Sequence, residues 1–404
     1  MTYKPLFLNK KLINADITLP ASKSISNRAL ILNALAYSPY EIENLADCDD
    51  TNVMLKALDS NKTTFDIGAA GTAMRFLTAF LSKTVGEWVI TGSKRMKERP
   101  IKLLVDALNS LGGRIKYIEN EGYPPLRIYG SALTGGEIHL NGGVSSQYIS
   151  ALMMIAPYMQ KGLKIILEGN VISVPYILMT LNMMRDFGVK VRFENNVIEI
   201  KPQTYQAVRY KVESDWSAAS YWYEILSIAG EGRIFLEGLQ KDSYQGDSKV
   251  AGLFQQLGVK TEYLSNGIVL TPNNNTCDVF EYDFINQPDL AQTFAVTCCL
   301  KNIPFHFNGI QSLKIKETDR VEALIKELKK FGFVLTEPEN GELSWDGKTL
   351  PLEDVATPSI STYDDHRMAM AFAPVALVQP VIIENPEVVS KSYPRFWEDI
   401  ERIK

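Results

Sequence analysis

Four segments of this 404-residue chain share one outline, and this internal repeat limits the folds that the chain can adopt. Each segment begins with a helical pattern that ends at a glycine. A strand pattern, a turn and a second strand pattern follow in that order. The turn of the second copy is Asn-Asn and lacks the usual hairpin glycine. The closing glycines suit the left-handed backbone conformation that often ends an α-helix. They lie seventy to seventy-six residues apart, at Gly112, Gly188, Gly258 and Gly332. Roughly six such units would fill the chain, so we expect an α/β protein of repeated units in two halves.

Two further segments, SSQYISALMMIAPYM and DLAQTFAVTCCL, are apolar around nearly the whole helical circumference. Helices of this composition are buried inside a domain. Adjacent Cys298 and Cys299 fall in the second segment and are expected to lie in that buried helix. A solenoid is the alternative architecture, but the long period and mixed helix and strand content fit it less well.

Charge and cysteine content argue against several classes of protein. The net charge of −5 is unfavourable for broad nucleic-acid binding, which normally needs a basic face. The four cysteines show no C-x-x-C spacing, so neither disulfides nor a metal site is expected. The start lacks signal-peptide features and no apolar run reaches transmembrane length. We therefore expect a cytoplasmic protein without membrane or nucleic-acid partners and, since no coiled coil is evident, a monomer.

Cations and hydroxyls gather where apolar helical patterns begin. LPASKSISNRALILNALA places Lys23 and Arg28 in this way, and KIKETDRVEALIKEL and STYDDHRMAMAFAPVAL repeat the arrangement. Cations at a helix start oppose the helix dipole, so they cost stability unless an anion offsets them. Capping by Thr318, Asp319 or Asp365 explains only those side chains. A solvated charged face is the alternative for RMKERPIKLL, and a tight strand-to-helix turn is the alternative for DIGAAGTAMRFL.

Neither a P-loop nor a dinucleotide fingerprint occurs, and no serine lies in a nucleophile elbow. The clustered cations, serines and glutamine instead favour small ligands that carry phosphates and carboxylates.

Eleven stretches, in order from residue 19 to residue 396, resemble the 5-enolpyruvylshikimate-3-phosphate synthase family of 3-phosphoshikimate 1-carboxyvinyltransferases. TYDDHRMAM, KETDR and RMKERP are together highly specific for that family. The full set is LPASKSISNRALILNALA, DDT, AAGTAMRFL, RMKERPI, SSQYISALM, SDWSAAS, YQGD, QPDLAQT, KETDRVEAL, TYDDHRMAMAFA and SKSYPRF.

The resemblance implies the two-domain enolpyruvyl-transferase fold, an inside-out α/β barrel type with three repeated units in each domain. It implies one domain over 20–213, a second over 1–19 and 214–404, and an active site in the cleft between them. The implied reaction transfers the enolpyruvyl group of phosphoenolpyruvate to the 5-hydroxyl of shikimate 3-phosphate and releases phosphate. This step belongs to the shikimate pathway toward chorismate and the aromatic amino acids, and the family uses no cofactor and no metal.

The resemblance also implies residue roles. The residues that would hold shikimate 3-phosphate are Lys23, Ser24, Arg28, Ser145, Ser146, Gln147, Ser173, Asp289, Ser312 and Lys316. Those that would hold phosphoenolpyruvate are Lys23, Gly71, Arg99, Gln147, Arg320, Arg367 and Lys391. For the proton transfers, Asp289 is the expected base and Glu317 the expected acid, because substrate charge would keep that carboxyl protonated. Lys391 and Lys23 are rivals for the acid role.

Three positions depart from the family pattern. Ala69 and Phe76 stand where the family often has Asn and Pro, and Ser312 stands where it frequently has Asn. Phe76 is expected to shift Gly71 and Thr72, and we predict altered affinity for glyphosate, the family's phosphoenolpyruvate-competitive inhibitor. An inhibition constant unchanged by Ala69→Asn with Phe76→Pro would contradict that prediction.

Two rival functions remain. The sister transferase that uses UDP-N-acetylglucosamine relies on a loop cysteine, and no cysteine occurs between Arg95 and Asn109. A binding module without catalysis would have lost some of the catalytic set, yet Asp289, Glu317 and Lys23 are all present.

Overall fold

The computed structural model describes residues 2–8, 11–351 and 357–403, and the chain divides into two units. The inserted unit is Ala21–Val212, and the split unit combines Met1–Pro20 with Glu213–Lys404. The boundaries expected from sequence, 20–213, differ from this division by one residue at each end.

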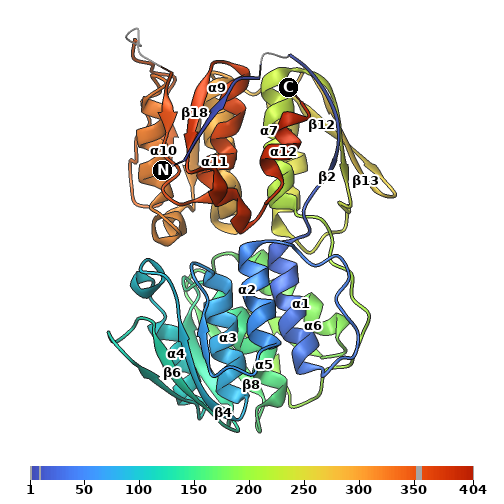
Figure 1. Ribbon diagram of the computed structural model, residues 1–404, viewed down its shortest axis with the longest axis vertical. Coiled ribbons are helices and arrows are strands. Elements are labelled where there is room, and N and C mark those ends of the chain that lie inside the picture. Colours follow the sequence, from blue (N-terminus) through green and yellow to red (C-terminus); the bar gives the residue numbers. More distant parts are fainter. Residues whose placement is uncertain (1, 9–10, 352–356, 404) are drawn as a thin grey trace. The chain divides into compact units, whose positions relative to one another are not determined.

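The inserted unit contains two four-stranded sheets, ordered β3-β4-β6-β5 and β7-β8-β10-β9. Figure 1 labels β4, β6 and β8 of these sheets together with the helices of the unit. Its strands are β3 (Thr64–Asp66), β4 (Gly86–Thr91), β5 (Arg114–Tyr117), β6 (Leu126–Gly130), β7 (Gly136–Asn141), β8 (Leu163–Glu168), β9 (Val191–Glu194) and β10 (Val197–Ile200). Its α-helices are α1 (Lys23–Leu35), α2 (Asp49–Leu58), α3 (Gly71–Lys83), α4 (Lys102–Ser110), α5 (Ser146–Ile155) and α6 (Val174–Asp186).

The split unit contains sheets ordered β12-β13-β11-β2, β14-β15-β16 and β1-β18-β17. Its strands are β1 (Tyr3–Leu6), β2 (Leu12–Thr18), β11 (Glu231–Glu237), β12 (Val259–Leu264), β13 (Gly267–Pro272), β14 (Phe280–Asp283), β15 (Phe305–Asn308), β16 (Leu343–Trp345), β17 (Ser359–Ile360) and β18 (Val381–Glu384). Its α-helices are α7 (Trp216–Ala229), α8 (Val250–Phe254), α9 (Ala291–Leu300), α10 (Arg320–Lys329), α11 (His366–Phe372) and α12 (Phe396–Glu401).

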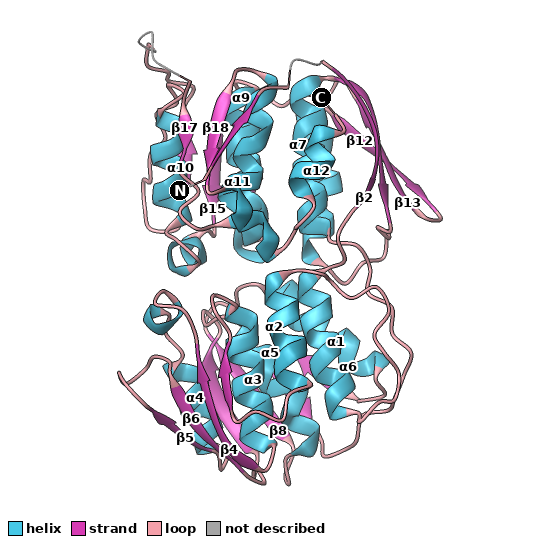
Figure 2. Ribbon diagram, in the orientation of Figure 1, coloured by secondary structure: helices cyan, strands magenta, loops and turns pink. Residues whose placement is uncertain are grey.

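The predicted repeats are visible as helices flanked by parallel strands. Strand β3 pairs in parallel with β4, β7 with β8, β14 with β15, β17 with β18 and β2 with β11. In the inserted unit a single parallel bridge, between Glu43 and Lys211, is what we identify as the remnant of a sixth copy. In the split unit, strands lie on both sides of the central helices (Figure 2). The predicted α/β fold with helices inside is therefore confirmed.

The closing glycines have the predicted left-handed conformation. Their φ angles are 98° at Gly112, 81° at Gly188, 92° at Gly258 and 86° at Gly332. The Asn-Asn turn of the second copy still forms a β9–β10 hairpin, because Asn195 and Asn196 adopt φ of 48° and 60°. Asparagine tolerates this region better than other residues with a side chain, so the missing glycine is not needed.

The fourth repeat differs from its prediction. Instead of a full hairpin after Gly332, the structure has the short strand β16 and isolated bridges of Phe333 with Thr349 and Thr336 with Ser344. Pro338 interrupts this segment and has no N–H to donate to a ladder, so the predicted first strand is reduced to these bridges.

Each unit has its own apolar core, and the predicted buried helices contribute to both. All residues of α5 except Gln147 are buried, and α9 is buried from Ala291 through Cys299. Cys298 and Cys299 lie in α9 as predicted. Within the described residues, no helix has the length and apolarity to cross a membrane, and no group of three His, Cys, Asp or Glu side chains is arranged to hold a metal.

Candidate active site

The start of α1 carries the first group of predicted site residues. Ser22 is its N-cap and accepts a hydrogen bond from the Ile25 amide at 3.4 Å, which fixes the turn that presents Lys23 and Ser24. The Lys23 Nζ lies 3.2 Å from the carboxylate of Asp50, which is 4% exposed near the start of α2. An ion pair with so little solvent exposure restricts where the ammonium can point.

Arg28 is buried one turn farther along α1, at 2% exposure. Its Nε donates to Thr180 Oγ1 at 2.7 Å and its Nη1 donates to the Ser24 carbonyl at 2.9 Å. Burial lowers the pKa of Arg28 to about 10, so the side chain stays charged at neutral pH. Among the described residues no carboxylate forms an ion pair with it, and a buried cation without a counter-ion favours binding of an anion.

The start of α3 places backbone close to a second arginine. A Cβ at Gly71 would lie 2.6 Å from Arg99 Nη1, so any side chain at this position would require the Arg99 guanidinium to move. Gln147, at the start of α5, donates from Nε2 to Thr72 Oγ1 at 3.1 Å. The predicted residues Gly71, Arg99 and Gln147 are therefore linked around one helix N-terminus, where the dipole favours negative charge.

Three serines of the inserted unit lie at helix starts. Ser145 caps α5 by accepting from the Gln147 amide at 3.3 Å, and Ser146 beside it is 8% exposed. Ser173 precedes α6 in the left-handed region, at φ 54° and ψ 36°, and its side chain makes no capping hydrogen bond. A non-glycine residue held there costs on the order of 1–2 kcal/mol and is a reason to consider function.

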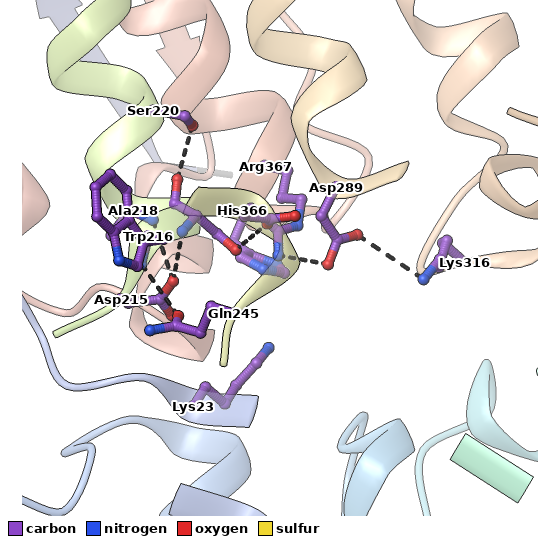
Figure 3. A network of polar contacts seen from close by, with 12 residues as sticks. Lys23, Asp215, Trp216, Ala218, Ser220, Gln245, Asp289, Lys316, His366 and Arg367 are labelled. Carbon is purple, nitrogen blue, oxygen red and sulfur yellow. Dashed lines mark hydrogen bonds and ion pairs between the residues drawn. The ribbon is translucent and has the colours of Figure 1, made fainter. Parts of the chain in front are cut away.

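In the split unit the carboxylate of Asp289 lies among cations. Arg367 Nη2 is 2.8 Å away, Arg320 Nη1 is 3.2 Å away and Lys316 Nζ is 3.8 Å away. Figure 3 shows Asp289 with Arg367 on one side and Lys316 on the other. Asp289 follows Pro288 in the turn that leads into α9, which sets its direction.

Arg320 connects this carboxylate to two more. At the start of α10, it donates from Nε to Asp365 at 2.7 Å and from Nη2 to Glu317 at 3.0 Å. Burial alone would lower the pKa of Arg320, but the carboxylates of Asp365, Glu317 and Asp289 outweigh it and raise the pKa. Glu317 also lies 3.1 Å from Lys391 Nζ, so two cations contact it.

The predicted residues thus form two groups, one in each unit. The inserted unit holds Lys23, Ser24, Arg28, Gly71, Arg99, Ser145, Ser146, Gln147 and Ser173. The split unit holds Asp289, Ser312, Lys316, Glu317, Arg320, Arg367 and Lys391. Ser312 is half-buried in η7 (Gln311–Ile315), and within the described residues its hydroxyl makes no hydrogen bond to the other predicted residues.

Three buried aspartates in these groups received no site role from sequence. Asp50 pairs with Lys23, and Asp365, which the sequence places as a helix cap, also accepts a hydrogen bond from Arg320. Asp247 is 3% exposed and accepts from Ser217 Oγ at 2.5 Å. Burial, followed by the nearby charge of Asp289, raises the pKa of Asp247 to about 7. The motifs DDT, YQGD and TYDDHRMAM contain these aspartates, but local patterns do not reveal their partners.

Comparison with known proteins places the chain within one family. A family model described as EPSP synthase (3-phosphoshikimate 1-carboxyvinyltransferase) matches residues 9–63 and 57–400. The 3-phosphoshikimate 1-carboxyvinyltransferase of Bacteroides fragilis (strain YCH46) is 55% identical over 392 residues, 96% of this chain and 95% of that protein. Its counterpart in Sulfurovum sp. (strain NBC37-1) is 39% identical over 434 residues, 100% of this chain and 99% of that one.

A solved structure agrees at the level of the fold. EPSP synthase from Acinetobacter baumannii aligns with a TM-score of 0.80 at 21% identity, covering 100% of this chain and 98% of that one.

Proposed function

Because this chain belongs to the EPSP synthase (3-phosphoshikimate 1-carboxyvinyltransferase) family, we propose that its two groups of polar side chains bind and activate the two substrates of that reaction. The enzyme transfers the enolpyruvyl group of phosphoenolpyruvate to the 5-hydroxyl of shikimate 3-phosphate and releases phosphate, in the shikimate pathway. We further propose that it works as a cytoplasmic monomer. We also propose that it binds no nucleic acid, because the net charge of −5 is unfavourable for such binding.

The proposed site for shikimate 3-phosphate combines a buried cation with hydroxyl donors. Arg28 supplies the charge, and its burial without a carboxylate partner among the described residues supports an anionic ligand. The other proposed ligand residues are Lys23, Ser24, Ser145, Ser146, Gln147, Ser173, Asp289, Ser312 and Lys316.

The proposed site for phosphoenolpyruvate uses the α3 start and the arginines of the split unit. Gly71 and Arg99 supply a close backbone approach and a guanidinium. The remaining proposed contacts are Lys23, Gln147, Arg320, Arg367 and Lys391. Charge-assisted hydrogen bonds of roughly 1.5–3 kcal/mol each would hold a ligand with a phosphate and a carboxylate.

The observation that carries the catalytic proposal is the Asp289 carboxylate among three cations. An ionised carboxylate can accept a proton, and the cations favour its ionised form. In the proposed addition step, the 5-hydroxyl oxygen bonds to C2 of phosphoenolpyruvate while its proton passes to Asp289. The methylene carbon gains a proton at the same time. The bond from C2 to the phosphate oxygen then breaks, phosphate leaves with the proton held by Asp289, and one methyl proton returns to the group that donated it, which restores the double bond.

Glu317 is the proposed donor of the methylene proton. Its carboxylate lies 3.0 Å from Arg320 Nη2 and 3.1 Å from Lys391 Nζ, and these two cations favour its ionised form. An anionic substrate that engages these two cations would weaken that preference and allow Glu317 to hold a proton. Lys391 and Lys23 are the alternative donors.

The function is tested by phosphate release from phosphoenolpyruvate with chelator present, with product identified by mass spectrometry. We expect release with shikimate 3-phosphate and none with UDP-N-acetylglucosamine. Asp289→Asn should lower kcat at least about 100-fold, while calorimetry still detects shikimate 3-phosphate binding. Glu322→Gln is the matched control, because Glu322 is an exposed α10 carboxylate paired only with Lys326 at 2.5 Å among the described residues. A full-rate Asp289→Asn enzyme would make the base assignment wrong.

A further inference from the structure

Neutral groups hold the guanidinium of Arg28 within its own plane. Its Nη2 donates to Ser150 Oγ at 3.2 Å and to the Tyr176 carbonyl at 3.4 Å, in addition to the Nε and Nη1 bonds described above. Thr180 and Ser150, both fully buried, lie 2.8 Å apart through their hydroxyl oxygens. A guanidinium has five N–H groups, and these bonds use four of them. The fifth, on Nη1, has no acceptor among the described residues and can donate to a ligand.

Two aromatic rings also lie beside the guanidinium of Arg28. Arg28 Cζ lies 5.3 Å from the ring centroid of Phe76 and 6.0 Å from that of Tyr176. Phe76 is fully buried on α3, so its contact with the cation is desolvated, where a cation–π interaction is strongest. The sequence suggested that Phe76 acts on the start of its own helix, but the ring lies against the cation of α1.

We propose that Phe76 is a positioning residue that sets the orientation of Arg28 and thereby the affinity for shikimate 3-phosphate. This inference rests on the proposed role of Arg28. The neutral hydroxyls and carbonyls hold the guanidinium within its plane, and the ring faces it from the side of α3. Without the ring, the remaining Nη1 donor loses its fixed direction, so the acceptor substrate is bound less tightly.

Phe76→Leu keeps an apolar side chain in the core and removes the nearer of the two aromatic rings beside Arg28. We expect the Kd for shikimate 3-phosphate to rise about five- to thirtyfold, as a desolvated cation–π contact would give. The KM for phosphoenolpyruvate and kcat should change less than about twofold. Phe187→Leu is the matched control, because Phe187 is equally buried in the same unit and no cation lies over its ring among the described residues.

A double-mutant cycle separates positioning from general loss of packing. If Phe76 acts through Arg28, Phe76→Leu should have almost no further effect on shikimate 3-phosphate binding in an Arg28→Ala background. Independent, additive effects would overturn the proposal. So would a Phe76→Leu effect no larger than that of Phe187→Leu.

The outcomes also separate this inference from the site assignment. If Arg28→Ala leaves shikimate 3-phosphate binding unchanged, the proposed role of Arg28 is wrong. If Arg28→Ala weakens binding and Phe76→Leu does not, only the positioning role is wrong. If the leucine variant does not fold, Phe76→Met, which nearly conserves volume, replaces it in the cycle. The proposal is then judged by the same two criteria, additivity with Arg28→Ala and comparison with Phe187→Leu.

Discussion

Asp365→Asn tests how much the buried carboxylate that contacts Arg320 contributes to the stability of the split unit. Asp365 is fully buried and accepts from Arg320 at 2.7 Å through Nε and at 3.2 Å through Nη2. It also caps α11 by accepting from the Arg367 amide at 2.9 Å. The substitution removes the negative charge and keeps the size of the side chain.

The expected loss follows from what Arg320 retains. Removing one partner of a buried ion pair costs about 3–5 kcal/mol when the other charge is left alone. Arg320 is only 1% exposed, but Asp289 and Glu317 still contact it, so the loss should lie near the lower limit. Asparagine is as good an N-cap as aspartate, so the capping contribution should not change. We expect the unfolding free energy of the split unit to fall by about 3 kcal/mol.

Urea unfolding followed by tryptophan fluorescence measures this loss. Four of the five tryptophans lie in the split unit, so the fluorescence reports mainly on it: Trp216, Trp222, Trp345 and Trp397. Glu322→Gln should cost less than about 0.5 kcal/mol, because it breaks only an exposed i, i+4 pair. A loss below about 1 kcal/mol for Asp365→Asn, or one equal to that of Glu322→Gln, would refute the reasoning.

Two further predictions concern one residue of each unit. Gly71→Ala should raise the KM for phosphoenolpyruvate at least about tenfold, because its Cβ would lie 2.6 Å from Arg99 Nη1; an unchanged KM would show that Arg99 moves aside without consequence. Burial first, and then Asp289, raise the pKa of Asp247 from 3.8 to about 7, so between those values the folded protein holds a proton that the unfolded chain has lost. The unfolded state then binds fewer protons, so the free energy of unfolding should fall as pH rises through this window. Asp247→Asn should flatten that dependence in urea titrations between pH 5 and 8, and an equally steep profile would contradict the assignment.

The local part of the fold could be predicted from sequence because local physics determines it. Glycines such as Gly188 and Gly258 end helices in a left-handed conformation that residues with a side chain adopt only at a higher free energy. The spacing of these glycines therefore revealed the period of the repeat. The parallel pairing of β2 with β11 could not be predicted from the residue pattern itself, because the whole inserted unit separates the two strands in the chain. After Gly332 the repeat pattern predicted a strand that the structure reduces to isolated bridges, because one proline in the segment outweighs the pattern.

The candidate site divides in the same way. Helix starts with cations identified Lys23, Arg28 and Arg320, since the dipole makes such residues unfavourable without an anion. Their partners are not local: Arg320 and Asp365 are 45 positions apart, and Arg28 and Thr180 are 152 apart. Only tertiary packing brings these groups together, so sequence indicated the charges and not how they are held.

The two buried arginines are held by different means, and this difference has a consequence for ligand binding. Arg320 contacts three carboxylates, so an incoming anion meets a charge that is already balanced. Arg28 contacts hydroxyls, carbonyls and aromatic faces, and among the described residues no carboxylate balances it. In a medium of low effective dielectric, the attraction of an unbalanced charge for an anion is stronger than that of a balanced one. Arg28 should therefore contribute more to substrate affinity, whereas Arg320 should contribute more to the order of Asp289 and Glu317, the two carboxylates proposed to transfer protons.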